Sequence, residues 1–218
     1  MVKVFRLFWI LILILSLSAC ASESLAADQL PWVGDAPVLF KDDFTTQDGG
    51  WTTLEDSLSF IGYDDGGFRL RSSVPDYQFI SVPGLNFKDV QVYAQVRKLE
   101  GPDDNLFGVV CRYQDPQNFY AFLISSDGYF GIFEMQNGYL GLINQVHMDF
   151  DKVIERGRGT NELMVICQGD KLGFLVNDQP LLQVQDDTLS FGDVGLLAGS
   201  LASGGVDVFF DNFIVLKR

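Results

Sequence analysis

The side chains of this sequence best suited to chemistry are aromatic, amide and charged groups that alternate with apolar residues along strand-like runs. Aromatic rings stack on the CH faces of sugar rings, while amide, guanidinium and carboxylate groups hydrogen-bond sugar hydroxyls. A sheet face with both kinds of group is predicted to bind carbohydrate, although an ordinary solvated sheet face would also be polar. The residues predicted to bind are Tyr93, Gln95, Arg97, Arg112, Phe119, Glu134, Gln136 and Tyr139.

Histidine-dependent and nucleotide-dependent chemistry has little support in the sequence. His147 is the only histidine, and no serine lies in a G-x-S-x-G motif, so a Ser-His-Asp or Cys-His centre is not indicated. The chain has neither a P-loop nor a G-x-G-x-x-G motif, and no His/Cys cluster has zinc spacing. We therefore expect no nucleotide and no zinc, and we place His147 in a surface loop.

Carboxylates leave one catalytic alternative, because glycoside hydrolysis needs only two of them, held about 5 to 10 Å apart. The sequence offers Glu134 together with Glu100 or Asp104. Most other acidic residues fall in turns, where Asp has a local structural use. A carboxylate-dependent glycoside hydrolase or related lyase is thus the main rival to a binding function without catalysis. A purely structural interaction module is the third reading.

Two acidic segments near the chain ends would suit a structural Ca²⁺ ion if the terminal strands pair. Asp42-Asp43-Phe44 lies near the start and Phe210-Asp211-Asn212-Phe213 near the end, and clusters of oxygen ligands are what Ca²⁺ prefers. Hydrogen bonding at strand ends explains the same residues equally well. No other cofactor is expected.

The predicted binding residues depend on a four-stranded antiparallel meander between Phe107 and Ile143. Its apolar runs are separated by turn signals at Gln114–Gln117, Asp127-Gly128 and Asn137-Gly138. The last two are typical of two-residue hairpin loops. Loops of that length place Phe122 opposite Phe133, and Met135 opposite Leu140.

This register assigns one face of the meander to the core and leaves the polar residues on the other face. The core face is predicted to hold Phe107, Val109, Cys111, Tyr120, Phe122, Ile124, Phe133, Met135, Leu140 and Leu142. If Val90–Lys98 pairs with Phe107–Tyr113 through the acidic loop after it, Tyr93, Gln95 and Arg97 join the polar face.

The rest of the chain repeats short strand-like runs between turn signals about every 8 to 12 residues, with no convincing amphipathic helix. Outside the meander, strands are expected at residues 38–42, 60–63, 68–71, 78–82, 90–98, 162–168, 172–176, 181–185, 194–198 and 206–216. With 218 residues and 47% hydrophobic content, one sizeable core is expected. The sequence therefore predicts a single all-β sandwich.

The balance of charge argues against a nucleic-acid partner. The chain has 29 acidic and 15 basic residues, which gives a net charge of −14. The charge becomes −16 if the first 19 residues, which include Lys3 and Arg6, are removed. Such a surface repels phosphate and is expected to be well solvated.

The first residues are typical of an export signal. Lys3 and Arg6 precede an apolar run, Leu7–Leu17, and small residues then lead to Cys20. The run is short for a membrane span, which needs about 20 apolar residues. Leu-Ser-Ala-Cys also resembles the lipobox of bacterial lipoproteins, which implies that Cys20 becomes the lipid-modified first residue.

This resemblance implies an exported protein that is lipid-anchored to the bacterial cell membrane or outer membrane. We predict a signal peptide at residues 1–19, a tether at 20–36 and a β-sandwich domain at 37–218. The tether has small, polar, Pro and Gly residues with no sustained period. The predicted partners are the membrane, through Cys20, and a glycan.

The two remaining cysteines, Cys111 and Cys167, are both expected to point into the core. An exported protein permits a disulfide. Sheets stacked about 10 Å apart, however, hold facing residues beyond the usual limit of about 7 Å between disulfide-bonded Cα atoms. We therefore expect two buried free thiols.

The order of several motifs resembles the concanavalin A-like jelly-roll domains of bacterial envelope and secreted proteins, including laminin-G-like modules and the group named for 3-keto-disaccharide hydrolysis. The motifs are Asp42-Asp43-Phe44, Gly50-Trp51, Phe107–Tyr113, Asp115–Tyr120, Gly128-Tyr129, Leu175–Asn177, Gly192–Leu196 and Phe210–Phe213. The resemblance implies two curved antiparallel sheets and, where a ligand exists, glycan binding. No E-x-D-x-x-E strand of the laminarinase type is present, and no catalytic residue of such a family matches a position here.

Overall fold

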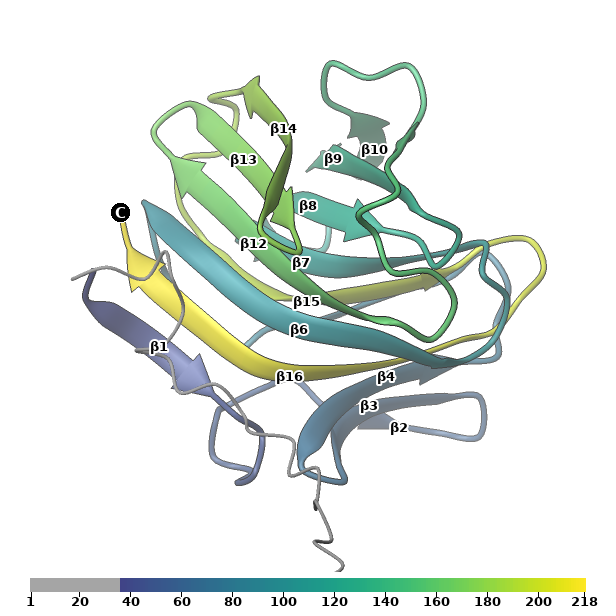
Figure 1. Cartoon of the computed structure of the whole chain (residues 1–218). Helices are drawn as coiled ribbons and strands as arrows, with labels where there is room; N and C mark the ends of the chain where they lie inside the picture. The colour runs from purple at the N-terminus through teal and green to yellow at the C-terminus, as the bar shows by residue number, and fades with distance from the viewer. Residues whose placement is uncertain (1–35) are drawn as a thin grey trace, which may run out of the picture.

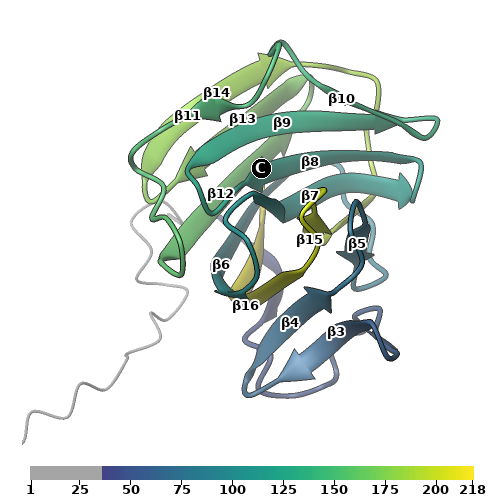
Figure 2. The same ribbon diagram turned by 90° about the vertical axis from the view of Figure 1, so that its right-hand side faces the viewer.

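The computed structural model describes residues 36–218, which form two antiparallel sheets stacked face to face (Figures 1 and 2). The nine-stranded sheet runs in the order β14 (Gln179–Gln185), β13 (Lys171–Val176), β12 (Thr160–Gln168), β6 (Val90–Glu100), β16 (Val206–Lys217), β4 (Gly67–Ser72), β3 (Ser59–Asp64) and β2 (Leu54–Glu55), with β1 (Val38–Asp42) beside β16. The seven-stranded sheet runs β10 (Tyr139–Leu142), β9 (Tyr129–Gln136), β8 (Asn118–Ile124), β7 (Asn105–Asp115), β15 (Asp193–Ser200) and β5 (Gln78–Ser81), with β11 (Asp149–Phe150) beside β9.

The prediction of an all-β sandwich is confirmed, and each expected strand is present with ends close to those predicted. The strands β2 and β11 were not expected, because runs of two residues carry no periodic signal. Residues 36–218 contain no helix long and apolar enough to cross a membrane. The predicted signal peptide, Cys20 and nearly all of the tether lie outside the described residues.

The main core fills the space between the two sheets. In β6, Val90, Val92, Ala94 and Val96 point inward, and they meet side chains such as Phe122 from the seven-stranded sheet. Strands with this alternation bury one face of each sheet, which is the usual basis of a β-sandwich.

The connection between β8 and β9 is one residue longer than predicted. The backbone N–H of Ser125 donates to the carbonyl of Tyr129 at 2.8 Å, and that of Gly128 donates to Ser125 at 3.0 Å. The loop therefore has three residues and uses Gly128 at a φ of 102°. As a result Phe122 lies opposite Ile132, so the predicted pairing of Phe122 with Phe133 is wrong.

This shift exchanges the faces of β9 and β10, because neighbouring residues of a strand point to opposite sides. Phe133, Met135, Leu140 and Leu142, which were predicted to be in the core, lie on the outer face of the seven-stranded sheet. Glu134, Gln136 and Tyr139 instead lie on the side that faces the nine-stranded sheet. The predicted pair Met135–Leu140 is confirmed, and Cys111 lies opposite Tyr120.

The strands β6 and β7 belong to different sheets. β6 pairs with β12 and β16, whereas β7 pairs with β8 and β15. The expectation that β6 pairs with β7 is therefore wrong. A short loop permits either a hairpin or a crossing between sheets; here Gly101, at a φ of 96°, starts the crossing.

Cys111 and Cys167 form a disulfide bond, so the expectation of two free thiols is wrong. Their Cα atoms are 6.9 Å apart, near the upper end of the range that a disulfide can span. The expectation assumed the average spacing of stacked sheets, but β7 and β12 approach more closely at this point.

Candidate functional site

A pocket of about 340 Å³ opens between β9–β10 and the connection from β14 to β15. β10 and β14 are the edge strands of the two sheets, and both lie at the upper side of Figure 1. The pocket is lined by Glu134, Gln136, Tyr139, Gly141, Leu142, Ile143 and Asp186. The register shift described above places Glu134, Gln136 and Tyr139 on the side of β9 and β10 that faces the nine-stranded sheet. At this edge of the sandwich, polar side chains therefore stand where apolar side chains close the core elsewhere.

Asp186 is held in place from beneath by the buried Tyr120. The Tyr120 hydroxyl donates to Asp186 Oδ1 and accepts from the backbone N–H of Leu189 at 3.0 Å. The backbone N–H of Thr188 donates to the same Oδ1 at 2.9 Å. Burial acts to raise the pKa of Asp186, but the hydrogen bonds from Tyr120 and Thr188 and the charge of Arg112 outweigh it and lower that pKa.

Glu134 lies opposite Tyr120 in the sheet and close to Asp186. Its Oε1 atom is buried and receives no hydrogen bond from any of residues 36–218. Burial raises the pKa of Glu134, and the charge of Asp186 raises it further, against the lowering effect of a hydrogen bond from Thr188. The pocket thus contains two carboxyl groups whose pKa values are moved in opposite directions.

Arg112 lies beneath the pocket and does not line it. Its Nη1 donates to the carbonyl of Leu189 at 2.6 Å, its Nη2 donates to that of Gly169 at 2.7 Å, and Asp89 lies 3.7 Å away. The side chain is buried, and its residue has a φ of 51°. Arg112 therefore holds the connection that carries Asp186 and has no exposed group for a ligand.

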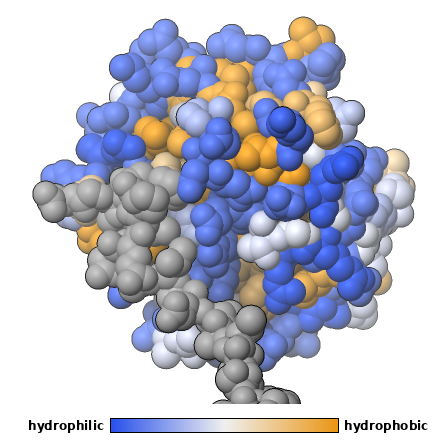
Figure 3. Space-filling model, in the orientation of Figure 1, coloured by the Kyte–Doolittle hydropathy of each residue, from blue (hydrophilic) through white to orange (hydrophobic). Residues whose placement is uncertain are grey.

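The other predicted binding residues lie on different surfaces. Gln95 donates to Glu162 at 3.2 Å and accepts from Asn212 at 2.9 Å, while Arg97 stacks 4.8 Å above the ring of Phe209. These two and the buried Tyr93 lie on the outer face of the nine-stranded sheet. Figure 3 shows that the side of the molecule seen in Figure 1 is largely hydrophilic, with hydrophobic patches among the hydrophilic side chains.

Three of the eight predicted residues, Glu134, Gln136 and Tyr139, come together in the pocket. Phe119 is buried on the outer face of the seven-stranded sheet, so the expectation of one shared surface for all eight is wrong. Sequence reasoning missed Asp186. Its only local signal is Asp186-Asp187-Thr188 after a strand, which looks like an ordinary turn.

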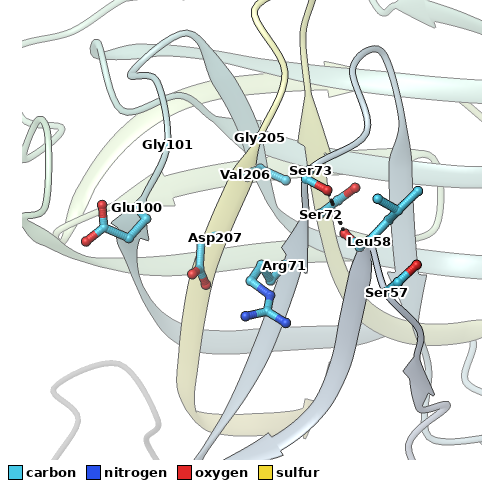
Figure 4. Close-up of a pocket in the computed structure, with 10 residues that line it drawn as sticks. All are labelled: Ser57, Leu58, Arg71, Ser72, Ser73, Glu100, Gly101, Gly205, Val206 and Asp207. Atoms are coloured by element: carbon cyan, nitrogen blue, oxygen red, sulfur yellow. Dashed lines mark hydrogen bonds between the residues drawn. The ribbon is translucent and has the colours of Figure 1, made fainter.

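A second pocket, of about 380 Å³, lies at the ends of β4, β6 and β16 (Figure 4). Arg71 and Asp207 face each other across neighbouring strands there, and Glu100 lies beyond Asp207. Both carboxylates already have cationic partners: Asp207 accepts from Arg69 at 2.7 Å and Glu100 from Arg158 at 2.7 Å. Glu100 is therefore remote from Glu134 and engaged elsewhere, so this predicted carboxylate pair is not assembled.

The acidic segments at the two ends of the chain do meet, since Asp42 pairs with Phe213. However, Asp42 accepts hydrogen bonds from the backbone N–H of Phe44 at 2.7 Å and from Trp51 Nε1 at 2.9 Å. Within residues 36–218, no group of three or more His, Cys, Asp or Glu side chains could hold a metal ion. Strand-end hydrogen bonding thus accounts for Asp42. His147, as expected, lies in an exposed loop.

No family model matches this chain, and no curated protein is detectably similar to it in sequence. Its structure is similar to the carbohydrate-binding module CBM66 from Bacillus subtilis, with a TM-score of 0.63 and 18% identity over 77% of this chain and 96% of that one. A protein of unknown function with a galectin-like fold, also from Bacillus subtilis, has a TM-score of 0.60 and 14% identity over 83% of this chain and 96% of its own.

The fold is a jelly-roll β-sandwich. A xylan β-1,4-xylosidase from Bacillus halodurans shares this jelly roll, with a TM-score of 0.59 and 16% identity over 81% of this chain. The match covers only 39% of the xylosidase chain. At such low identities the similarities establish the jelly-roll fold alone, so the ligand has to be argued from the pocket.

Proposed function

We propose that this jelly-roll protein is an exported lipoprotein that binds a saccharide in the pocket of Glu134, Gln136, Tyr139 and Asp186, without cleaving it. The observation that carries the proposal is the pairing of two partly buried carboxylates with a tyrosine ring that is 80% exposed. The exposed rings of Tyr129 and Phe150 pack on each other, whereas the ring of Tyr139 packs on no other aromatic ring of residues 36–218. The likeness to a carbohydrate-binding module supports this reading.

Each group of the pocket has a role in this proposal. The ring of Tyr139 stacks on the CH face of a sugar, and the free oxygens of Asp186 and Glu134 accept from sugar hydroxyls. Gln136 both donates and accepts, so it suits a hydroxyl that does both. The contacts between Tyr120, Thr188 and Asp186 keep one carboxylate in position before the ligand arrives, which lowers the entropic cost of binding.

The proposal is tested by screening the full chain, solubilised in detergent, on a glycan array. Tyr139→Ala is expected to weaken binding of the best ligand at least about tenfold, as loss of a stacking contact worth about 1.4 kcal/mol would. Tyr129→Ala is the matched control, because Tyr129 lies at the far end of β9, is 42% exposed and packs on Phe150. An array without any bound glycan, or equal losses in both variants, would reject the proposal.

A second candidate function, a carboxylate-dependent glycoside hydrolase, is favoured by one observation. The pKa of Glu134 is raised while that of Asp186 is lowered, and opposed shifts of this kind separate a general acid from its ionised partner. Release of reducing sugar from an array ligand, abolished in Glu134→Gln while binding persists, would assign this activity. If the ligand is still intact after prolonged incubation, the hydrolase function is rejected and binding without cleavage is the function that stands.

A further inference from the structure

The pocket has an unusual balance of charge and hydrogen-bonding groups. Two of the residues that line the pocket, Glu134 and Asp186, carry carboxylates, and no lysine or arginine lines it. The nearest guanidinium described above, that of Arg112, is buried and engaged by the carbonyls of Leu189 and Gly169. By contrast, the carboxylates of the pocket in Figure 4 are paired with Arg69 and Arg158.

One carboxylate oxygen of the pocket has no donor at all. Oε1 of Glu134 is buried and receives no hydrogen bond from any of residues 36–218. Oδ1 of Asp186 already receives hydrogen bonds from Tyr120 and from the backbone N–H of Thr188, and the side chain of Thr188 is a further, neutral donor beside both carboxylates. A carboxylate only accepts, so a ligand that fills the pocket has to bring donors, and preferably positive charge.

A hydroxyl group contributes one donor and no charge, and the acetamide of an N-acetylated sugar contributes one N–H. An ammonium group contributes three donors and a full positive charge, and its hydrogen bonds to carboxylates are about twice as strong as neutral ones. An acidic sugar would place a third negative group beside Glu134 and Asp186. The whole chain, with a net charge of −14, adds to the same preference.

We propose that the pocket selects a saccharide with a free amino group, with the sugar ring on Tyr139 and its ammonium between Glu134 and Asp186. This inference rests on the proposed saccharide-binding function and specifies the ligand class. It distinguishes hexosamine units from their N-acetylated and acidic counterparts.

The test is isothermal titration calorimetry of the full chain in detergent at 150 mM salt. The probes are the β-1,4-linked tetramer of glucosamine, the corresponding tetramer of N-acetylglucosamine, and tetragalacturonate. The glucosamine tetramer is expected to bind at least about tenfold more tightly than its N-acetylated form, since one charge-assisted contact contributes about 1.4 kcal/mol or more. Tetragalacturonate is expected not to bind.

Variants separate the pocket from general attraction of a cation to an acidic protein. Glu134→Gln and Asp186→Asn are each expected to remove most of the preference for the amino sugar. Glu55→Gln makes the same change of charge on the exposed edge strand β2 and is expected to leave affinity unchanged. A melting temperature of each variant that is no lower than that of the wild type would show that folding is intact.

The possible outcomes are distinct. Equal affinity for the amino and N-acetylated tetramers would overturn the inference and leave the proposed function standing. Binding of other glycans, with no binding of either tetramer, would have the same two consequences. A loss in Glu55→Gln as large as that in Glu134→Gln would also overturn it. If neither tetramer binds and the glycan array is empty, the inference and the proposed function both fail.

Discussion

At the scale of single residues, the folded environment of Glu134 disfavours its negative charge. Its carboxyl group is half-buried near Asp186, and one oxygen is unpartnered within the described residues. In the unfolded chain the same group is hydrated by water. Ionised Glu134 therefore costs stability, as is common where binding groups are kept ready for a ligand.

This cost predicts how stability depends on pH. Because folding raises the pKa of Glu134, the folded state binds its proton more tightly, and the contribution of this residue to stability falls as pH rises above the unfolded value. Glu134→Gln keeps the shape and removes the charge. At pH 7.5 it should unfold at higher urea concentration, with a gain of about 1 kcal/mol, and at pH 4 the gain should shrink.

Urea unfolding at the two pH values, followed by tryptophan fluorescence, measures this difference. Glu55→Gln, on an exposed strand, serves as the control and should change stability little at either pH. A gain in Glu134→Gln that is larger at pH 4 than at pH 7.5 would contradict the prediction.

The residues of the pocket differ in how far the sequence reveals them. Glu134, Gln136 and Tyr139 are noticeable because they interrupt apolar runs in a predicted strand. Asp186 acquires its role from Tyr120, which lies 66 residues away in sequence. A contact at that separation depends on how the two sheets stack, and no local pattern records it.

At the scale of elements, the disulfide joins β7 to β12 across the sandwich. Cys111 and Cys167 are 56 residues apart, and closing a loop of that size restricts the unfolded chain by about 4 kcal/mol in the entropic account. The double variant Cys111→Ala/Cys167→Ala is expected to lose about that much stability, which corresponds to a melting temperature lower by about 10 °C.

Calorimetry of the wild type with and without a reducing agent compares the melting temperatures of the oxidised and reduced protein. Reduction should lower the melting temperature of the wild type toward that of the double variant and leave the variant unchanged. A wild-type protein that melts at the same temperature in both conditions would show that the bond is absent or without effect.

The strands themselves were predictable, but their assignment to sheets was only partly so. Short strand-like runs between turn signals located β6 and β12 close to their observed ends. The partner of β6 was not predictable, because a loop as short as the one after Glu100 fits a hairpin or a crossing between sheets. Because the prediction assigned β6 to the sheet that contains β7, it placed Tyr93, Gln95 and Arg97 on the wrong surface.

At the scale of the whole molecule, the proposed lipid on Cys20 would hold the sandwich near a membrane. From Ala21 to Ala36 a fully extended chain reaches at most about 50 Å. Several acyl chains on one residue anchor a protein stably, since each buried CH₂ contributes about 0.8 kcal/mol. A protein held in this way meets glycans of the cell envelope at high local concentration.

Cys20→Ser is expected to move the protein from the membrane fraction to the soluble fraction. Fractionation of cells followed by immunoblotting measures the distribution, and Cys111→Ala/Cys167→Ala serves as a control for cysteine loss in general. Retention of Cys20→Ser in the membrane fraction would reject the lipid anchor.

The three-residue loop Ser126–Gly128 has a consequence for how such proteins diverge. Deleting one codon there would create a two-residue loop and turn β9 and β10 over, so that Glu134, Gln136 and Tyr139 would exchange places with Phe133, Met135 and Leu140. A single small deletion would thus erase the pocket while keeping every strand. The length of this one loop therefore decides whether the polar residues of β9 and β10 face the nine-stranded sheet or the opposite side.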